Sequence, residues 1–163
     1  MAVLWDTTLA SRLQPEGDVI DYVVDRASDG DVVRVAAPAV LEIVYGYQRK
    51  AGTDSRFGEL LNWFIRLVAS EVFRVVPLDG RAAVVAGRVR AEIPHAPAKR
   101  KGDQRARTMR QASWLLDIEI AATAFAAGLD IATDNRGDFE AISACVDELF
   151  PEAPPLVVTA APA

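Results

Sequence analysis

The chain has 163 residues, 51% of them hydrophobic, and a net charge of −5 at pH 7, a composition that supports a core and excludes a disordered chain. The single cysteine, Cys145, excludes a disulfide framework and a cysteine-rich zinc site. No apolar run approaches the roughly 18 residues of a membrane helix, and Asp6 interrupts the N-terminal segment as no secretory signal would, so we expect a cytoplasmic protein without a membrane segment.

Apolar periodicity predicts strands and helices that alternate along the chain. Strands are expected at 2–5, 32–36, 72–76, 129–133 and 155–159, and helices at 15–30, 38–51, 53–70, 79–93, 113–127 and 138–142. Thr53 or Asp54 is a candidate helix N-cap, as is Asp79. Gly128 is placed to end a helix in the left-handed region of backbone space.

Strands that alternate with helices are typical of proteins in which helices cover a parallel sheet. We therefore expect an α/β fold with a central parallel sheet of about five strands and helices on both faces. The sequence contains no internal repeat and no convincing domain boundary. One domain is expected over 1–150, completed at 151–163 by a C-terminal strand and a Pro/Ala-rich tail.

The segment between His95 and Arg110 has an unusual charge. It holds six basic residues and one acid, a local net charge of +5, and leaves −10 on the rest of the chain. Pro94, Pro97 and Gly102 indicate a loop or hinge. A solvated loop and a surface for a polyanion are both consistent with this pattern. The six basic residues are Lys99, Arg100, Lys101, Arg105, Arg107 and Arg110.

Carboxylates follow the expected strands. Asp6 comes directly after the first strand, Glu42 lies near the first turn of the helix after the second strand, and Asp117 lies in the first two turns of the helix after the basic segment. The exit of the strand at 129–133 is followed by Asp134, Asn135 and Asp138. Strand ends and helix starts share one edge of a parallel sheet, so these acids are expected to meet there. Ordinary capping or first-turn positions are the alternative for the first three acids.

Several carboxylates in a partly buried place repel one another unless a positive charge joins them. No Lys or Arg lies within three residues of Asp6, Glu42 or Asp117, so a divalent cation is the simpler partner. Oxygen ligands favour Mg²⁺ or Mn²⁺ over zinc, and the sole histidine, His95, lies in the basic segment. The chemistry that this indicates is phosphoryl transfer to a metal-activated water.

Other sites built on an acid after the first strand do not fit the sequence. A receiver domain needs paired acids and a later lysine, and a haloacid-dehalogenase-type phosphatase needs Asp-x-Asp, whereas Thr8 occupies the second position here. The phosphate-binding Gly-Lys-Ser/Thr loop and the Gly-x-Gly dinucleotide motif are both absent. A single histidine and a single cysteine, far apart in sequence, disfavour a nucleophile–base pair.

Five segments, in order, resemble the motifs of PIN-domain ribonucleases, and in particular those of VapC-type toxins from bacterial toxin–antitoxin pairs. They are Asp-Thr-Thr-Leu at 6–9, Ala-Pro-Ala-Val-Leu-Glu-Ile-Val-Tyr-Gly at 37–46, Phe-Arg-Val-Val-Pro-Leu-Asp at 73–79, Asp-Ile-Glu-Ile-Ala-Ala-Thr-Ala at 117–124 with Gly-Leu at 128–129, and Thr-Asp-Asn-Arg-Gly-Asp-Phe at 133–139. Each segment alone is a weak signal, but five in order at suitable spacing are specific. The long basic insertion before Asp117 departs from the family pattern.

The resemblance implies a single PIN-like domain with Mg²⁺- or Mn²⁺-dependent endoribonuclease activity. The implied metal ligands are Asp6, Glu42 and Asp117 with Asp134 or Asp138, and the catalytic set is taken as Asp6, Glu42, Asp117 and Asp138, supported by Thr8 and Asn135. The basic segment would bind RNA phosphates outside the acidic pocket. The resemblance also implies a cognate antitoxin and a homodimer. A PIN nuclease of RNA processing and a non-catalytic RNA- or protein-binding module remain alternatives.

Overall fold

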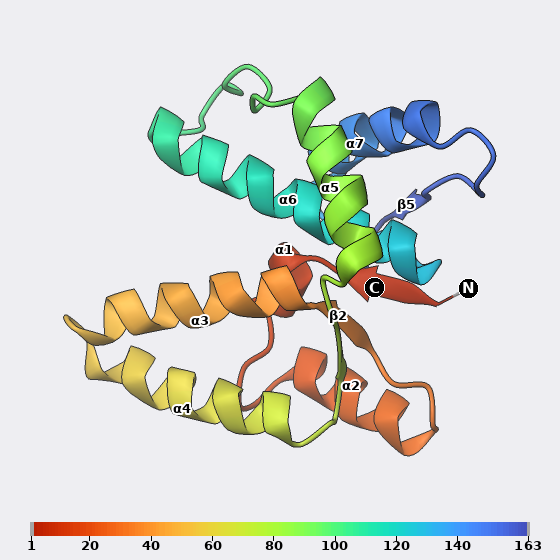
Figure 1. Cartoon of the computed structure of the whole chain (residues 1–163). Helices are drawn as coiled ribbons and strands as arrows, with labels where there is room; N and C mark the ends of the chain where they lie inside the picture. The colour runs from red at the N-terminus through yellow and green to blue at the C-terminus, as the bar shows by residue number, and fades with distance from the viewer. Residues whose placement is uncertain (1, 163) are drawn as a thin grey trace.

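Five short strands form one parallel sheet in a computed structural model that describes residues 2–162 (Figure 1). Met1 and Ala163, the last residue of the expected tail, lie outside the described residues. The strand order is β3-β2-β1-β4-β5, and the bounds are β1 Val3–Trp5, β2 Arg34–Ala36, β3 Arg74–Val76, β4 Asp130–Ala132 and β5 Val158–Thr159. The predicted α/β fold with a five-stranded parallel sheet is confirmed, although the strands are shorter than expected.

Two groups of helices flank this sheet (Figure 1). The first group comprises α2 Asp18–Ser28, α3 Ala37–Ala51 and α4 Ser55–Ala69, and the second comprises α5 Gly80–Glu92, α6 Arg107–Ala127 and α7 Arg136–Leu149. A single turn, α1 Thr7–Ala10, follows β1 and was not expected from the sequence. Within the described part of the chain, none of these helices combines the length and the apolarity that crossing a bilayer requires.

Local signals set several helix ends as expected. Asp54 accepts a hydrogen bond from the backbone N–H of Arg56 at 3.0 Å, and Asp79 accepts one from that of Ala82 at 2.9 Å. These carboxylates satisfy N–H groups that have no partner inside their helices. Gly128 ends α6 with φ at +66°, a conformation that favours glycine. These cap predictions are confirmed.

Two helix boundaries differ from the prediction. Helix α6 begins at Arg107 rather than at residue 113, because residues 107–112 are mostly good helix formers whose charges had suggested a loop. Arg107 and Arg110 therefore lie on a helix, and Asp117 lies in the middle of α6 rather than near its start. Helix α7 extends to Leu149, well beyond residue 142, because Val146 continues its buried face.

The core joins the middle of the sheet to α4. Leu4, Val35 and Ile131, from three adjacent strands, are fully buried. The Phe64 side chain of α4 is also fully buried and stacks on Phe73, with 6.3 Å between ring centroids. Because α4 packs along α3 as a helical hairpin (Figure 1), this contact also fixes the helix that carries Glu42.

Phe64→Ala is expected to lower the free energy of unfolding by about 3–5 kcal/mol, because a buried aromatic ring leaves a cavity. The neighbouring Ile65 is 49% exposed, so Ile65→Ala should cost less than about 1 kcal/mol. Urea denaturation of both variants measures the difference. Equal losses would contradict the packing of α4 on the sheet.

Candidate active site

The carboxyl ends of the two central strands bring the first acid to the edge of the sheet. Strands β1 and β4 are parallel neighbours, with Trp5 opposite Ala132. Asp6 and Thr133, the residues that directly follow the two strands, are therefore also adjacent to each other. Asp6 is only 1% exposed, although it carries a carboxylate.

Three donors hold the Asp6 carboxylate. Thr8 Oγ1 donates to it at 2.8 Å, Thr133 Oγ1 at 2.6 Å and the backbone N–H of Leu9 at 3.1 Å. Burial raises the pKa of Asp6, and these hydrogen bonds oppose that shift. Asp6 thus caps α1 and also presents a buried carboxylate at the strand exit, so its capping role and its position in the site coexist.

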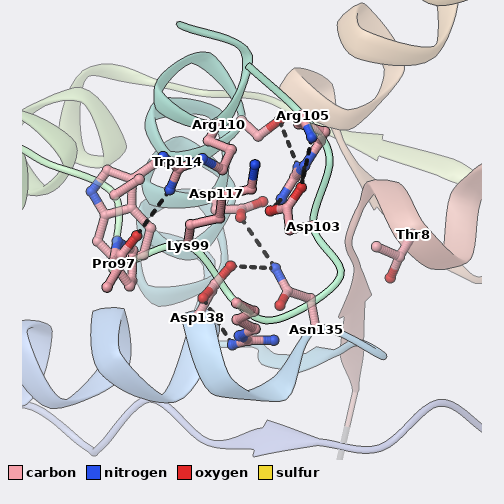
Figure 2. Close-up of a pocket in the computed structure, with 14 residues that line it drawn as sticks. Thr8, Pro97, Lys99, Asp103, Arg105, Arg110, Trp114, Asp117, Asn135 and Asp138 are labelled. Atoms are coloured by element: carbon pink, nitrogen blue, oxygen red, sulfur yellow. Dashed lines mark hydrogen bonds and ion pairs between the residues drawn. The ribbon is translucent and has the colours of Figure 1, made fainter. Parts of the chain in front are cut away.

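Asp117 is the electrostatic centre of the site. The pKa of Asp117 is raised to about 8, first by burial and then by the negative charges of Asp6, Glu42 and Asp138, in that order of effect. Carboxylates at the end of β1, on α3 and on α7 therefore all act on Asp117 of α6. Asn135 links two of them, because its Nδ2 donates to Asp138 at 2.9 Å and to Asp117 at 3.4 Å (Figure 2).

Glu42 is oriented by a residue that the sequence analysis did not single out. Thr7 Oγ1 donates to Glu42 Oε2 at 2.6 Å. Thr133, which holds Asp6 and also accepts from the backbone N–H of Asn135 at 2.8 Å, was likewise not included among the site residues. Both hydroxyls lie next to strand exits that carry acids, and this adjacency was the available signal.

The two candidates for the last acid occupy different surroundings. Asp134 is exposed and pairs with Arg12, although its charge contributes to raising the pKa of Asp6. Asp138 is partly buried, accepts from Asn135 and forms an ion pair with Arg100 at 3.0 Å. Asp138, unlike Asp134, is among the charges that raise the pKa of Asp117. The geometry therefore groups Asp138 with the other three acids.

The basic segment lines a cavity of about 260 Å³ together with Asp117, Asn135 and Asp138 (Figure 2). Four of the six expected RNA-binding residues line it: Lys99, Arg100, Arg105 and Arg110. Lys101 and Arg107 are exposed and do not line this cavity. The segment thus lies against the acids instead of outside their pocket, which corrects the expectation.

One arginine of this segment is balanced locally. Arg105 pairs with Asp103 at 3.0 Å and lowers the pKa of Asp103 to about 2. Its charge also acts on Asp117, whose pKa it lowers slightly against the larger effects of burial and of the other acids. Positive charge within the chain therefore offsets only part of the negative charge at the site.

Within residues 2–162, no three Asp, Glu, His or Cys side chains are arranged as a ready ligand cluster for a metal ion. The donor set nevertheless fits Mg²⁺ or Mn²⁺, because it consists of oxygen atoms and carries excess negative charge. Mg²⁺ keeps several waters and is commonly bound through one or two carboxylates. Direct contact to one or two of these acids would therefore suffice, with the others acting through water and through their charge.

The comparisons with known proteins agree on the fold. No family model and no curated protein matches the chain. Among solved structures, FitAcB from Neisseria gonorrhoeae matches with a TM-score of 0.57 and 21% identity over 96% of this chain and 95% of that chain. VapBC2 from Rickettsia felis, bound to a DNA fragment from its promoter, matches with a TM-score of 0.56 and 15% identity over 98% of both chains. DNA-bound VapBC from Salmonella typhimurium matches with a TM-score of 0.55 and 18% identity, also over 98% of both.

These neighbours are toxin–antitoxin complexes of PIN-domain toxins. The matches cover nearly the whole length of each chain, and at 15–21% identity they establish the fold. The protein therefore has the PIN-domain fold, and the structural resemblance inferred from the five sequence segments is confirmed.

Asp117→Asn is expected to stabilise the metal-free protein. A carboxyl whose pKa is raised in the folded state favours folding when protonated, so the stability it contributes is present below about pH 4 and is lost as pH rises through about 8. At pH 8.5 in EDTA, the variant should gain about 1–3 kcal/mol of unfolding free energy, and its stability should change less between pH 4 and 8.5.

Urea denaturation across this pH range checks the prediction, with Asp25→Asn on the exposed face of α2 as the control for a lost negative charge. A variant at position 117 that is no more stable than wild type at pH 8.5 would contradict the repulsion among the four acids.

Proposed function

We propose that this chain is the toxin of a toxin–antitoxin pair and acts as a Mg²⁺- or Mn²⁺-dependent endoribonuclease that hydrolyses RNA phosphodiester bonds. One observation carries the proposal: on a PIN-domain fold, Asp117 lies close enough to Asp6, Glu42 and Asp138 for their charges to add to the burial that raises its pKa to about 8. A partly buried cluster of carboxylates is unfavourable unless a positive charge joins it, and a divalent cation suits its oxygen ligands.

The side chains have separate tasks in this proposal. Asp6 and Asp117 would hold the cation, and Glu42 and Asp138 would add negative charge or bind its waters. When bound, the cation supplies a water of lowered pKa and balances charge on the scissile phosphate. Thr8 and Thr133 keep the Asp6 carboxylate in one orientation, and Asn135 does the same for Asp138.

The cavity wall formed by the basic segment would bind the RNA backbone. Lys99, Arg100, Arg105 and Arg110 line the same cavity as Asp117 and Asp138. A local cationic surface reconciles the acidic chain with a polyanionic substrate.

The proposed partners follow from the structural neighbours. FitAB and VapBC were solved as complexes bound to DNA, and we propose a cognate antitoxin for this chain as well. A second copy of the chain is the other proposed partner. Leu41 and Tyr45 support a protein-facing surface on α3, since they are 61% and 59% exposed. An RNA substrate and such partners would place the protein in the cytoplasm.

Asp6→Asn should reduce Mg²⁺-dependent cleavage of a single-stranded RNA at least about 100-fold, because several kcal/mol of charge stabilisation are lost. Asp138→Asn should also lose activity, whereas Asp134→Asn, at an exposed residue paired with Arg12, serves as the matched control and should stay near wild type. Circular dichroism and thermal unfolding check that each variant is folded.

Undiminished, metal-dependent cleavage by Asp6→Asn would contradict the site. The absence of both cleavage and Mn²⁺ binding in the wild type would favour a non-catalytic binding module. Cleavage without growth arrest on induced expression would favour a nuclease of RNA processing.

Replacing Lys99, Arg105 and Arg110 together by Gln should weaken RNA binding and lower the slope of log affinity against log salt by about 2, since three phosphate contacts that release counterions are lost. Measurements use Asp6→Asn as the background, so that the RNA stays intact. The matched control replaces Arg26, Arg66 and Arg74, which are exposed and do not line the cavity. An unchanged salt slope in the first triple variant would make the basic segment an ordinary solvated loop.

A further inference from the structure

The Arg100 side chain packs against Gly137 and Asp138 beside the acidic site. Its Nη2 lies 3.0 Å from Asp138 Oδ1, and its guanidinium lies over Gly137 in the first turn of α7. A Cβ at position 137 would lie 3.4 Å from Arg100 Cζ and would clash with Nη2. The backbone of Gly137 does not have the positive φ that requires glycine, so the Arg100 guanidinium is the group that a side chain at this position would displace.

The loop that carries Arg100 is anchored at its base. Gln111 of α6 accepts from the backbone N–H of Ala96 at 3.1 Å and donates to the Pro94 carbonyl at 2.6 Å. Arg110 donates to the Pro97 carbonyl at 3.3 Å. The N–H of Asp103 donates to the Arg100 carbonyl at 3.1 Å, which closes a turn at the tip. Arg100 is therefore held near α7 by the fold of the loop as well as by the ion pair.

Both oxygens of Asp138 are engaged in this arrangement. Arg100 donates to Oδ1 and Asn135 donates to Oδ2. The amide of Asn135 is neutral, but the guanidinium is a fixed positive charge next to a carboxylate of the proposed cation site. A divalent cation beside Asp138 would be repelled by Arg100, and the cation or one of its waters would compete with Arg100 for the same oxygen.

We propose that Arg100 is a built-in counter-ion of the acidic site, which occupies Asp138 until a divalent cation displaces it. This inference rests on the proposed function, since it concerns the same acids. Arg100 is 62% exposed, and ion pairs at such positions are weak. The Arg100–Asp138 ion pair, hereafter called the latch, is therefore weak enough for a divalent cation to break. The released guanidinium stays beside the cavity, where a phosphate can replace Asp138 as its partner.

Mn²⁺ affinity of the full-length protein, measured by electron paramagnetic resonance without RNA, tests this proposal. Arg100→Gln should bind Mn²⁺ about 3–5-fold more tightly than wild type, because the competing charge is gone. Gly137→Ala should also bind Mn²⁺ more tightly than wild type, because its methyl group displaces the flexible Arg100 side chain without altering any charge. Alanine is also favoured over glycine in a helix, so the fold is not endangered.

Lys101→Gln is the matched control, because Lys101 neighbours Arg100 in sequence and lies outside the cavity lining. If Arg100→Gln binds Mn²⁺ no more tightly than Lys101→Gln does, or if Gly137→Ala binds Mn²⁺ with wild-type affinity, the latch is overturned. Either result leaves the proposed cation site intact. Wild-type affinity in Asp138→Asn also overturns the latch, because the cation then does not compete at Asp138. Mn²⁺ binding by none of these proteins overturns both the latch and the proposed cation site.

Discussion

Crowding of negative charge at one edge of the sheet is the constraint on which the site depends. Strands β1 and β4 are parallel neighbours, so the residues that follow them meet at this edge, and α6 brings Asp117 to the same place. The fold does not relieve the repulsion by spreading these acids apart. Burial and this repulsion together raise the pKa of Asp117, so its charged form is disfavoured in the absence of a ligand. A positively charged ligand relieves this repulsion when it binds, so its binding should raise the free energy of unfolding.

Most donors that the chain supplies to these acids are neutral. Hydroxyls from Thr7, Thr8 and Thr133 and the amide of Asn135 orient the carboxylates through hydrogen bonds. A neutral donor fixes the direction of a carboxylate but leaves its charge available, whereas a guanidinium cancels that charge. This difference separates the orienting residues from Arg100, which neutralises only Asp138. The site is thus pre-oriented while it keeps most of its attraction for a cation.

Features that depend on residues close together in the sequence could be predicted, whereas side-chain contacts between residues far apart in the sequence could not. Asp54, Asp79 and Gly128 act on backbone groups within a few residues, and the sequence pattern located them. The start of α6 was missed because Arg107 and Arg110 suggested a loop, although charged side chains suit a solvated helix face. The meeting of the acids was expected from topology alone. The contacts Thr7–Glu42 and Arg100–Asp138 join residues 35 and 38 positions apart, and no local pattern specifies such pairs.

The position of the basic segment changes how an acidic chain would take up a polyanion. A detached basic loop would attract RNA phosphates wherever they approached, but here basic and acidic side chains line the same cavity. A phosphate drawn to Lys99 and Arg110 would therefore meet negative charge from Asp117 and Asp138 as it moved inward. A divalent cation between the phosphate and the acids removes this repulsion and satisfies both sides. The basic and acidic side chains thus favour the binding of a phosphate and a cation together over the binding of either one alone. RNA and metal should therefore each strengthen the binding of the other.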